Sequence, residues 1–221
     1  MNKSLYGLGT LLTAGLLFGS FGIWVRLLSS DLSSYQQIAF RNIVALIIAF
    51  AIIYFRKISI SFKGVDPKYL ILFGISFPIG VIFYTFSMLN TSIMLGIFSF
   101  YLGSIVFSLI LGKVLFKESL TREKLVSLTL VFIGFYFFVQ PNGLAHLDKG
   151  MIFGIIAGLF DTISNSFRKH LAGKIDRVVL TLVPQIGGIA VATILMLYFG
   201  SFAIPVISTV NWFVGIVFGS M

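Results

Sequence analysis

The sequence contains no cysteine, few charged residues and two histidines. The absence of cysteine excludes disulfides, thiolate metal sites and a cysteine nucleophile. Charged residues make up 10% of the 221 residues, hydrophobic side chains make up 58%, and the mean hydropathy is +1.05. A soluble globular domain carries about 25% charged residues. The composition therefore predicts an all-α polytopic membrane protein rather than a soluble domain.

Sequence motifs of enzymes and nucleotide-driven pumps are absent as well. The chain has no His-Glu-x-x-His, no Gly-x-Ser-x-Gly and no Walker A pattern, and no span carries two acids at catalytic spacing. We therefore expect no enzyme activity and no cofactor. The formal charge of +9 comes from basic residues in short loops between apolar runs, which a membrane explains and a nucleic-acid partner does not.

Apolar runs near the ~20 residues that a bilayer core requires predict seven complete transmembrane helices. These runs are 5–28, 35–55, 69–89, 92–116, 125–140, 150–167 and 178–199. An eighth run, 206–221, has no polar tail and is interpreted as a truncated span. Two alternatives remain open: the sequence is a fragment, or the protein completes itself with another chain, as in a homodimer.

The basic residues are distributed unequally between the two sides of the membrane. Of the 16 Lys and Arg residues, thirteen lie on the side of the N-terminus, Arg26 and Lys149 lie on the other side, and Arg41 lies inside a span. Cytoplasmic loops carry the excess of Lys and Arg. The sequence therefore predicts a multi-pass protein of the inner or plasma membrane with a cytoplasmic N-terminus.

A short internal similarity suggests a repeat. Residues 15–21 align with residues 154–160 at an offset of 139, and this alignment pairs Gly15 with Gly154 and Gly19 with Gly158. The second segment lies five spans after the first, an odd number, so that the second copy is inverted in the membrane. We expect the four glycines to pack helices closely, in inverted five-helix repeats over residues 1–140 and, incompletely, 141–221.

Five segments together resemble EamA-type carriers of the drug/metabolite transporter superfamily. They are 18–26 (FGSFGIWVR), 39–42 (AFRN), 95–107 (LGIFSFYLGSIVF), 115–122 (LFKESLTR) and 132–135 (FIGF). The resemblance implies ten helices in two inverted repeats and transport of small metabolites. One departure is Gly103, where many members of the family carry proline, so that we expect a softer helix break there.

Candidate substrate-binding residues are polar and aromatic positions inside the spans. Arg41 has Gln37 one turn before it on the same helix face, and the resemblance also implies an arginine at this position. The alternative for Arg41 is an interfacial anchor whose side chain reaches the headgroups. Tyr84, Tyr101 and Trp24 are added as aromatic candidates, although Trp24 also has the position of an interfacial belt residue.

Asp161 lies within an apolar run, where a carboxylate is costly and usually marks a solute path. Helical spacing places it on one face with Gly154, Gly158 and Asn165. Two interpretations remain open. Asp161 either holds two helices together through hydrogen bonds, or contacts the substrate and carries a proton for coupled transport.

The sequence therefore predicts a secondary transporter, an exporter or exchanger of small metabolites such as amino acids or related compounds, working by alternating access. The rival hypothesis is an auxiliary or receptor-like membrane subunit that does not transport. An inverted repeat with polar residues near mid-membrane favours the transporter, because a passive scaffold has little reason to keep them.

Overall fold

The computed structural model describes residues 3–119, 121–139, 148–200 and 207–220. These residues form eight α-helices and no strand. The helices are α1 (Lys3–Leu28), α2 (Ser34–Arg56), α3 (Pro67–Asn90), α4 (Ile93–Phe116), α5 (Arg122–Val139), α6 (Lys149–Leu171), α7 (Arg177–Tyr198) and α8 (Thr209–Ser220). The all-helical fold predicted from composition is confirmed. The expected span limits at positions 140, 206 and 221 lie outside the described residues.

Six helices are long and apolar enough to cross a membrane, namely α1, α2, α3, α4, α6 and α7. The sequence predicted seven complete spans, and the difference is α5. Its first turn holds Arg122, Glu123 and Lys124, so that its apolar part begins at Leu125. From there to Val139 the helix covers about 22 Å at 1.5 Å per residue, which is less than the ~30 Å bilayer core.

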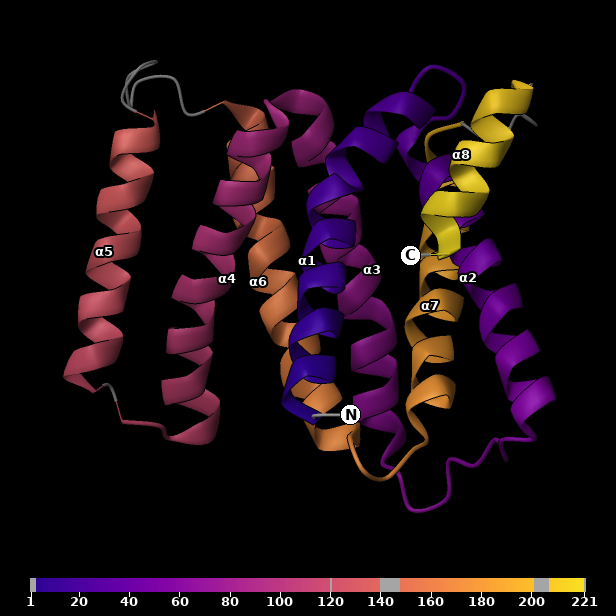
Figure 1. Ribbon diagram of the computed structural model, residues 1–221, viewed down its shortest axis with the longest axis horizontal. Helices are drawn as coiled ribbons and strands as arrows, with labels where there is room; N and C mark the ends of the chain where they lie inside the picture. Colours follow the sequence, from indigo (N-terminus) through magenta and orange to yellow (C-terminus); the bar gives the residue numbers. More distant parts are fainter. Residues whose placement is uncertain (1–2, 120, 140–147, 201–206, 221) are drawn as a thin grey trace.

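Polar residues at the ends of several helices stop one helix or start the next. Asp66, Asp148 and Asp176 accept hydrogen bonds from the first backbone N–H groups of α3, α6 and α7. Lys57 and Lys117 end α2 and α4 in the left-handed conformation, with φ of 51° and 53°. These caps satisfy backbone groups that a helix end leaves unpaired and produce the alternating directions seen in Figure 1.

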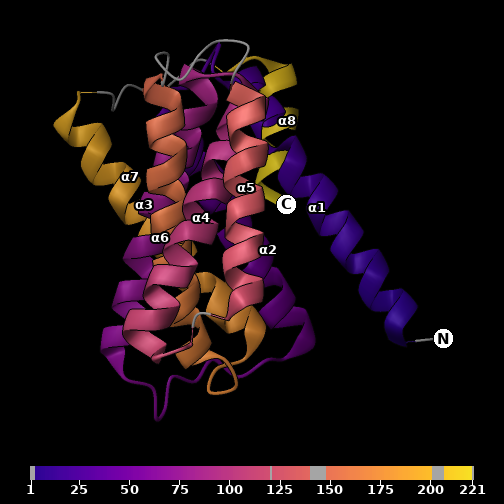
Figure 2. The same cartoon turned by 90° about the vertical axis from the view of Figure 1, so that its left-hand side faces the viewer.

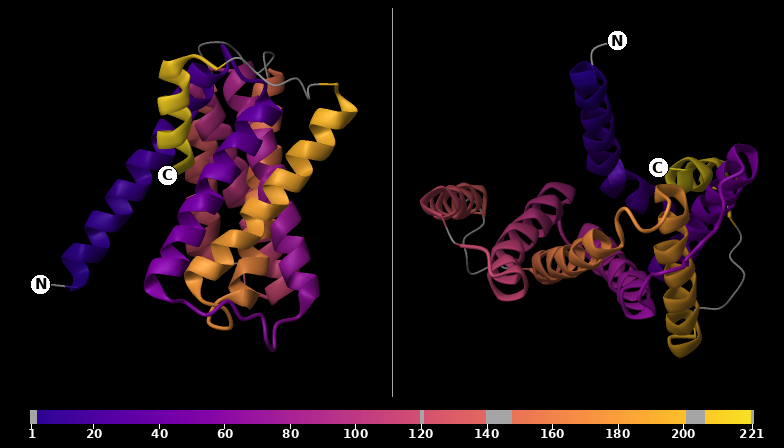
Figure 3. Two further views of the ribbon diagram at one scale, coloured as in Figure 1. Left: turned by 90° about the vertical axis from the view of Figure 1, so that its right-hand side faces the viewer. Right: turned by 90° about the horizontal axis from the view of Figure 1, so that it is seen from below.

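Helix α3 lies at the centre of the bundle. It packs against α6 and α7 and also touches α1, α2 and α4, while α2 packs against α7 and α8 packs against α1 and α2. α5 contacts α4 and forms one edge of the molecule (Figure 3). A glycine contact allows α3 and α7 to cross closely: Gly187 lies directly on the carbonyl oxygen of Gly74. Pro78, four residues after Gly74, removes the helical partner of that carbonyl.

The first half of α1 leans away from the other helices (Figure 2). Leu11, Leu12 and Leu16 are 62–76% exposed, whereas Val25 and Leu28 at the other end of the helix are fully buried. Arg26 ties this buried end to α3, because its Nε donates to the Met88 carbonyl oxygen at 3.1 Å and its Nη2 donates to that of Thr91.

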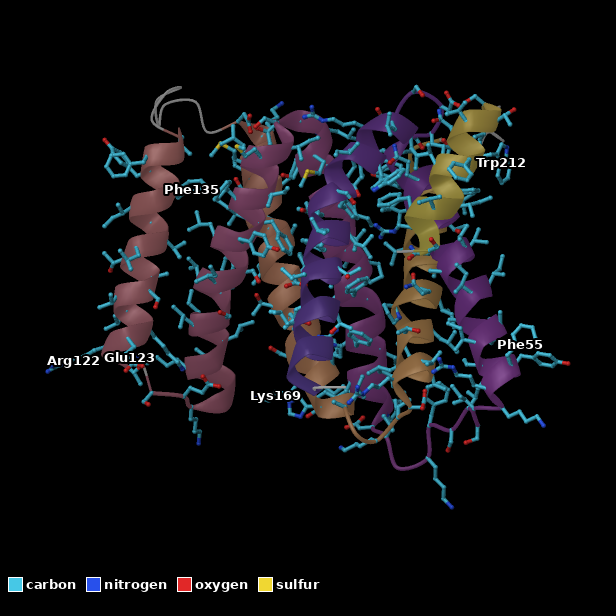
Figure 4. The ribbon with its side chains drawn as sticks, viewed as in Figure 1. Phe55, Arg122, Glu123, Phe135, Lys169 and Trp212 are labelled. Atoms are coloured by element: carbon cyan, nitrogen blue, oxygen red, sulfur yellow. The ribbon has the colours of Figure 1, made fainter. Side chains whose placement is uncertain are left out.

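Most of the basic residues lie at one end of the bundle. Arg122, Glu123 and Lys169 lie at this end in Figure 4, together with the α2–α3 and α6–α7 loops. We call it the basic end. The segregation matches the distribution on which the predicted cytoplasmic N-terminus rests, and the orientation itself stays a prediction.

Candidate functional site

A cavity of about 420 Å³ lies between the helices. Its walls come from α1, α2, α3, α4, α6, α7 and α8. The lining residues are mostly apolar and aromatic: Ala14, Leu17, Phe18, Phe21, Arg41, Ala45, Phe77, Gly80, Val81, Tyr84, Phe100, Asp161, Gln185, Phe218 and Gly219. Three of the predicted site residues therefore meet in one place, namely Arg41, Tyr84 and Asp161.

Asp161 lies near the middle of α6, about 18 Å along the helix axis from Lys149 at 1.5 Å per residue. Ser104 Oγ of α4 donates a hydrogen bond to Asp161 Oδ2 at 3.3 Å, and Asn165 Nδ2, one turn later on α6, donates to the same oxygen at 3.0 Å. Both protein donors therefore reach one carboxylate oxygen. The other oxygen, Oδ1, accepts no hydrogen bond from the described residues.

Glycine brings α6 close enough to α4 for the Ser104 contact. At Gly158, one turn before Asp161, a Cβ atom would overlap the backbone of Phe100 and Ser104, and at Gly154 it would meet Ser99 Cβ at 2.7 Å. Gly103 lies equally close to the Ile155 backbone of α6. Because α4 is helical through Gly103, the residue that departs from the family pattern serves as a close-packing position rather than a helix break.

Arg41 enters the cavity from α2, about 10 Å along the helix from Ser34. Its guanidinium carbon lies 5.1 Å from the centre of the Phe21 ring of α1 and 5.2 Å from the centre of the Phe218 ring of α8. Both distances are within the range of cation–π contacts. The side chain therefore points into the protein, which favours the cavity interpretation over the interfacial anchor.

Tyr84 of α3 belongs to an aromatic wall of the cavity. Its ring lies 4.7 Å from Phe100, 4.8 Å from Phe21 and 5.6 Å from Phe18, measured between ring centres. The residue is 3% exposed, and its hydroxyl is buried with no hydrogen-bond partner among the described residues. A buried hydroxyl without a partner is costly, and a bound solute can supply the missing hydrogen bond.

Four other candidates do not line the cavity. Gln37 is buried, and its Nε2 donates to the carbonyl oxygen of Leu32 at 3.1 Å. Trp24 Nε1 donates to Ser20 Oγ at 2.9 Å. Tyr101 is 47% exposed and touches Phe18 and Phe100. Asn165 is exposed and reaches the site through Asp161.

Gln37 does not reach the cavity because it lies one turn nearer the start of α2 than Arg41 does. There the loop from α1 returns and presents a carbonyl that needs a donor, so that sharing a helix face with Arg41 does not bring Gln37 into the same cavity. Tyr101 is adjacent to Phe100 on α4, and consecutive helical residues point about 100° apart, which directs Tyr101 away from the wall.

The two glycines of α1 differ from the expectation. Gly15 and Gly19 face open space, because no atom of the described residues lies within 4 Å of the point that a Cβ atom would occupy, whereas Gly22 contacts Met88 and Ile93. The first half of α1 leans out of the bundle, and both Gly15 and Gly19 lie on a part of the helix surface that no other described helix approaches. Gly154 and Gly158 therefore share their sequence pattern with Gly15 and Gly19 but not their environment.

Sequence reasoning missed Gln185 and the aromatic residues that surround Arg41. Gln185 is a polar residue in the middle of apolar α7, directly after Pro184, and the criterion that selected Asp161 would have found it. Phe21 and Phe218 carry no comparable signal, because the chain contains 25 phenylalanines. Their contact with Arg41 depends on how three helices pack, and one of these, α8, is distant from the other two in the sequence.

Comparison with known proteins gives one family. A family model described as the EamA-like transporter family matches residues 5–140 of the chain. No curated protein matches the chain.

Proposed function

The chain belongs to the EamA-like transporter family, and on this premise we propose that it is a secondary carrier that moves a small metabolite across the membrane by alternating access, as an exporter or exchanger. The observation that best supports this proposal is the cavity of about 420 Å³. Its mostly apolar lining includes Arg41, Asp161 and the unpartnered hydroxyl of Tyr84. Sites for small molecules have this size and this mixture of apolar walls with few polar groups.

The packing of the helices supports an inverted repeat. If α1, α2 and α3 correspond to α6, α7 and α8, then the α3–α6 contact corresponds to α8–α1 and the α3–α7 contact to α8–α2, while α2–α7 corresponds to itself. All of these contacts occur. α1 and α6 also run in opposite directions (Figure 1). We infer repeats over residues 1–140 and 141–221, with the cavity between them as the substrate site.

Asp161 is the group that we assign to proton coupling. It faces the cavity, and the described residues donate to Oδ2 alone. The free Oδ1 can accept a hydrogen bond from the substrate or carry a proton when the cavity is hydrated. A carboxylate whose purpose was to join helices would be expected to have donors on both oxygens.

Counterflow in proteoliposomes tests the proposed function. Vesicles containing the full chain are loaded with one metabolite of a panel of amino acids and related compounds, and exchange with the labelled metabolite outside is measured. We expect exchange of at least one compound, and a loss of roughly tenfold or more in Arg41→Gln, because the variant removes a charged hydrogen-bond donor.

Phe83→Leu is the matched control, because Phe83 stacks on Phe160 at 5.9 Å outside the cavity lining. This variant should exchange at the rate of the parent. Absence of exchange for the whole panel would favour the auxiliary or receptor-like alternative.

A further inference from the structure

Arg41 differs from Asp161, the other charged residue of the cavity lining, because its guanidinium has no polar partner among the described residues. Its side chain forms neither a hydrogen bond nor an ion pair with the residues that the structure describes. The ion pair found among these residues lies outside the cavity and joins Lys124 to Glu118 at 2.9 Å. A guanidinium presents five N–H donors in its plane. Placing these donors in an apolar cavity without acceptors is costly.

The two aromatic contacts leave those donors available. Phe21 and Phe218 interact with the guanidinium through their rings at 5.1 Å and 5.2 Å, and the rings are T-shaped to each other at 5.0 Å. Cation–π contacts stabilise the charge and restrict the orientation of the guanidinium, but they do not provide acceptors for hydrogen bonds from its N–H groups. Phe21 is supplied by α1 and Phe218 by α8, so that packing of these two helices determines where Arg41 points.

Asp161 is in the opposite situation. Its carboxylate already accepts hydrogen bonds from Ser104 and Asn165, which reduce its need for a positively charged ligand. The charged group of the cavity that lacks a hydrogen-bond partner is therefore Arg41, which needs an acceptor. Phe21, which contacts Arg41, also touches Tyr84, and the rings of Phe18, Tyr84 and Phe100 continue the aromatic surface from there.

We propose that the cavity selects an organic anion with a flat apolar body. The carboxylate or phosphonate oxygens of this anion accept hydrogen bonds from the N–H groups of Arg41, and its body packs on Phe18, Tyr84 and Phe100. Phe21 and Phe218 are positioning residues that hold the guanidinium for this contact. The inference names the substrate class of the carrier site and rests on the proposed function.

Equilibrium binding of small probes tests the proposal without requiring transport. Benzoate, benzylamine and benzyl alcohol are titrated onto the purified full chain in detergent, and saturation-transfer NMR gives their Kd values. We expect benzoate to bind most tightly, and its Kd to rise roughly tenfold or more in Arg41→Gln, since charged hydrogen bonds are lost.

The positioning role has its own matched set. Phe21→Leu and Phe218→Leu should each raise the Kd of benzoate about threefold to tenfold, because a leucine fills space but has no ring for the cation. Phe21→Tyr keeps the ring and should restore parental binding, and Phe83→Leu should leave the Kd unchanged. A purely structural role for Phe21 would weaken benzoate and benzyl alcohol equally.

Three results would overturn the inference. These are tighter binding of benzylamine than of benzoate, parental benzoate binding in Arg41→Gln, and parental binding in both leucine variants. If Arg41→Gln does not fold, the comparison of Phe21→Leu with Phe21→Tyr still decides. Benzoate binding by a chain that shows no counterflow would refute the transport function and leave the anion site standing.

Discussion

Arg41 and Asp161 face the same cavity but are held in different ways. Asp161 is oriented by hydrogen bonds from Ser104 and Asn165, whereas Arg41 is held by the rings of Phe21 and Phe218. A hydrogen-bonded carboxylate keeps its place when it is neutral or charged, and a cation between rings depends on its charge. This difference supports the tasks that we propose, proton exchange for Asp161 and ligand binding for Arg41.

Replacing Asp161 by Asn separates these tasks. The carboxamide keeps the shape of the side chain and can still accept from Ser104, but it cannot take up or release a proton. We expect transport by the parent in proteoliposomes to depend on pH, and we expect Asp161→Asn to insert and fold but to lose this dependence. Parallel pH profiles for the variant and the parent would mean that Asp161 is structural.

Asp31 lies outside the spans, and its carboxylate connects the α1–α2 loop to the start of α8. Hydrogen bonding lowers its pKa from 3.8 to about 2, chiefly by the backbone N–H of Ser208 and further by Asn211, Ser208 and Ser30. The Ser208 N–H donates to Asp31 Oδ2 at 2.9 Å, directly before the first turn of α8. The carboxylate thus satisfies a donor at a helix start, where negative charge is favourable.

The sign of the pH effect follows from the lowered pKa. The folded state binds the proton more weakly than the unfolded chain, so that the contribution is complete above pH 3.8 and is lost as the pH falls through about 2. We expect Asp31→Asn to speed hydrogen–deuterium exchange in α8 at neutral pH, with α6 unchanged as the internal control. Equal exchange in variant and parent would remove Asp31 as an anchor of α8.

At the scale of the elements, the glycines decide which helices approach closely. Gly158 lies against the backbone of α4, while Gly19, its partner at the offset of 139 residues, faces open space. A backbone atom cannot rotate away as a flexible side chain can, so that even one methyl group at Gly158 must push the helices apart.

This pair gives a matched test. Gly158→Ala should lower the free energy of unfolding by roughly 1–3 kcal/mol through overpacking. Gly19→Ala should raise it by up to about 1 kcal/mol, because alanine is the better helix former and nothing obstructs it. Thermal unfolding of both variants in detergent measures the difference. A Gly158→Ala protein as stable as the parent would contradict the close α4–α6 contact.

At the scale of the whole molecule, alternating helix directions place the basic loops at one end. Lys63 and Lys174 lie in loops at the basic end, and Ser30 lies in the α1–α2 connection at the other. Positive charge is retained on the cytoplasmic side. The orientation that we predict for the protein in the membrane therefore follows from this arrangement.

Accessibility tags can check the orientation. We expect a tag after Ser30 to react from outside the cell, and tags near Lys63 and Lys174 to react after the membrane has been permeabilised. Labelling of Lys174 from the same side as Ser30, with Lys63 on the opposite side, would show that a span between Lys63 and Lys174 has been assigned wrongly, with α5 as the first suspect because of its length.

The sequence by itself determined the membrane class, the helices and several members of the site. Hydropathy and caps act over a few residues, so that the limits of α2, α3, α4, α6 and α7 were predictable to within a few positions. Arg41 and Asp161 were selected because charged groups inside apolar runs are costly and need a reason, and Tyr84 was selected as an aromatic residue inside a span. Each of these patterns depends on residues that are close together in the sequence, so that it can be recognised without the tertiary structure.

Tertiary structure alone decided which candidates meet. Gln37 and Trp24 carry the same polar and aromatic signal as their neighbours, but the loop carbonyl and Ser20 take their hydrogen bonds. The contact of Arg41 with Phe21 and Phe218 joins α1, α2 and α8, and no periodicity within one helix encodes it. The leaning of α1 likewise separates Gly15 and Gly19 from the glycines they match in sequence. A side chain's partners depend on how helices pack in three dimensions, whereas its presence on a helix depends on its neighbours along the chain.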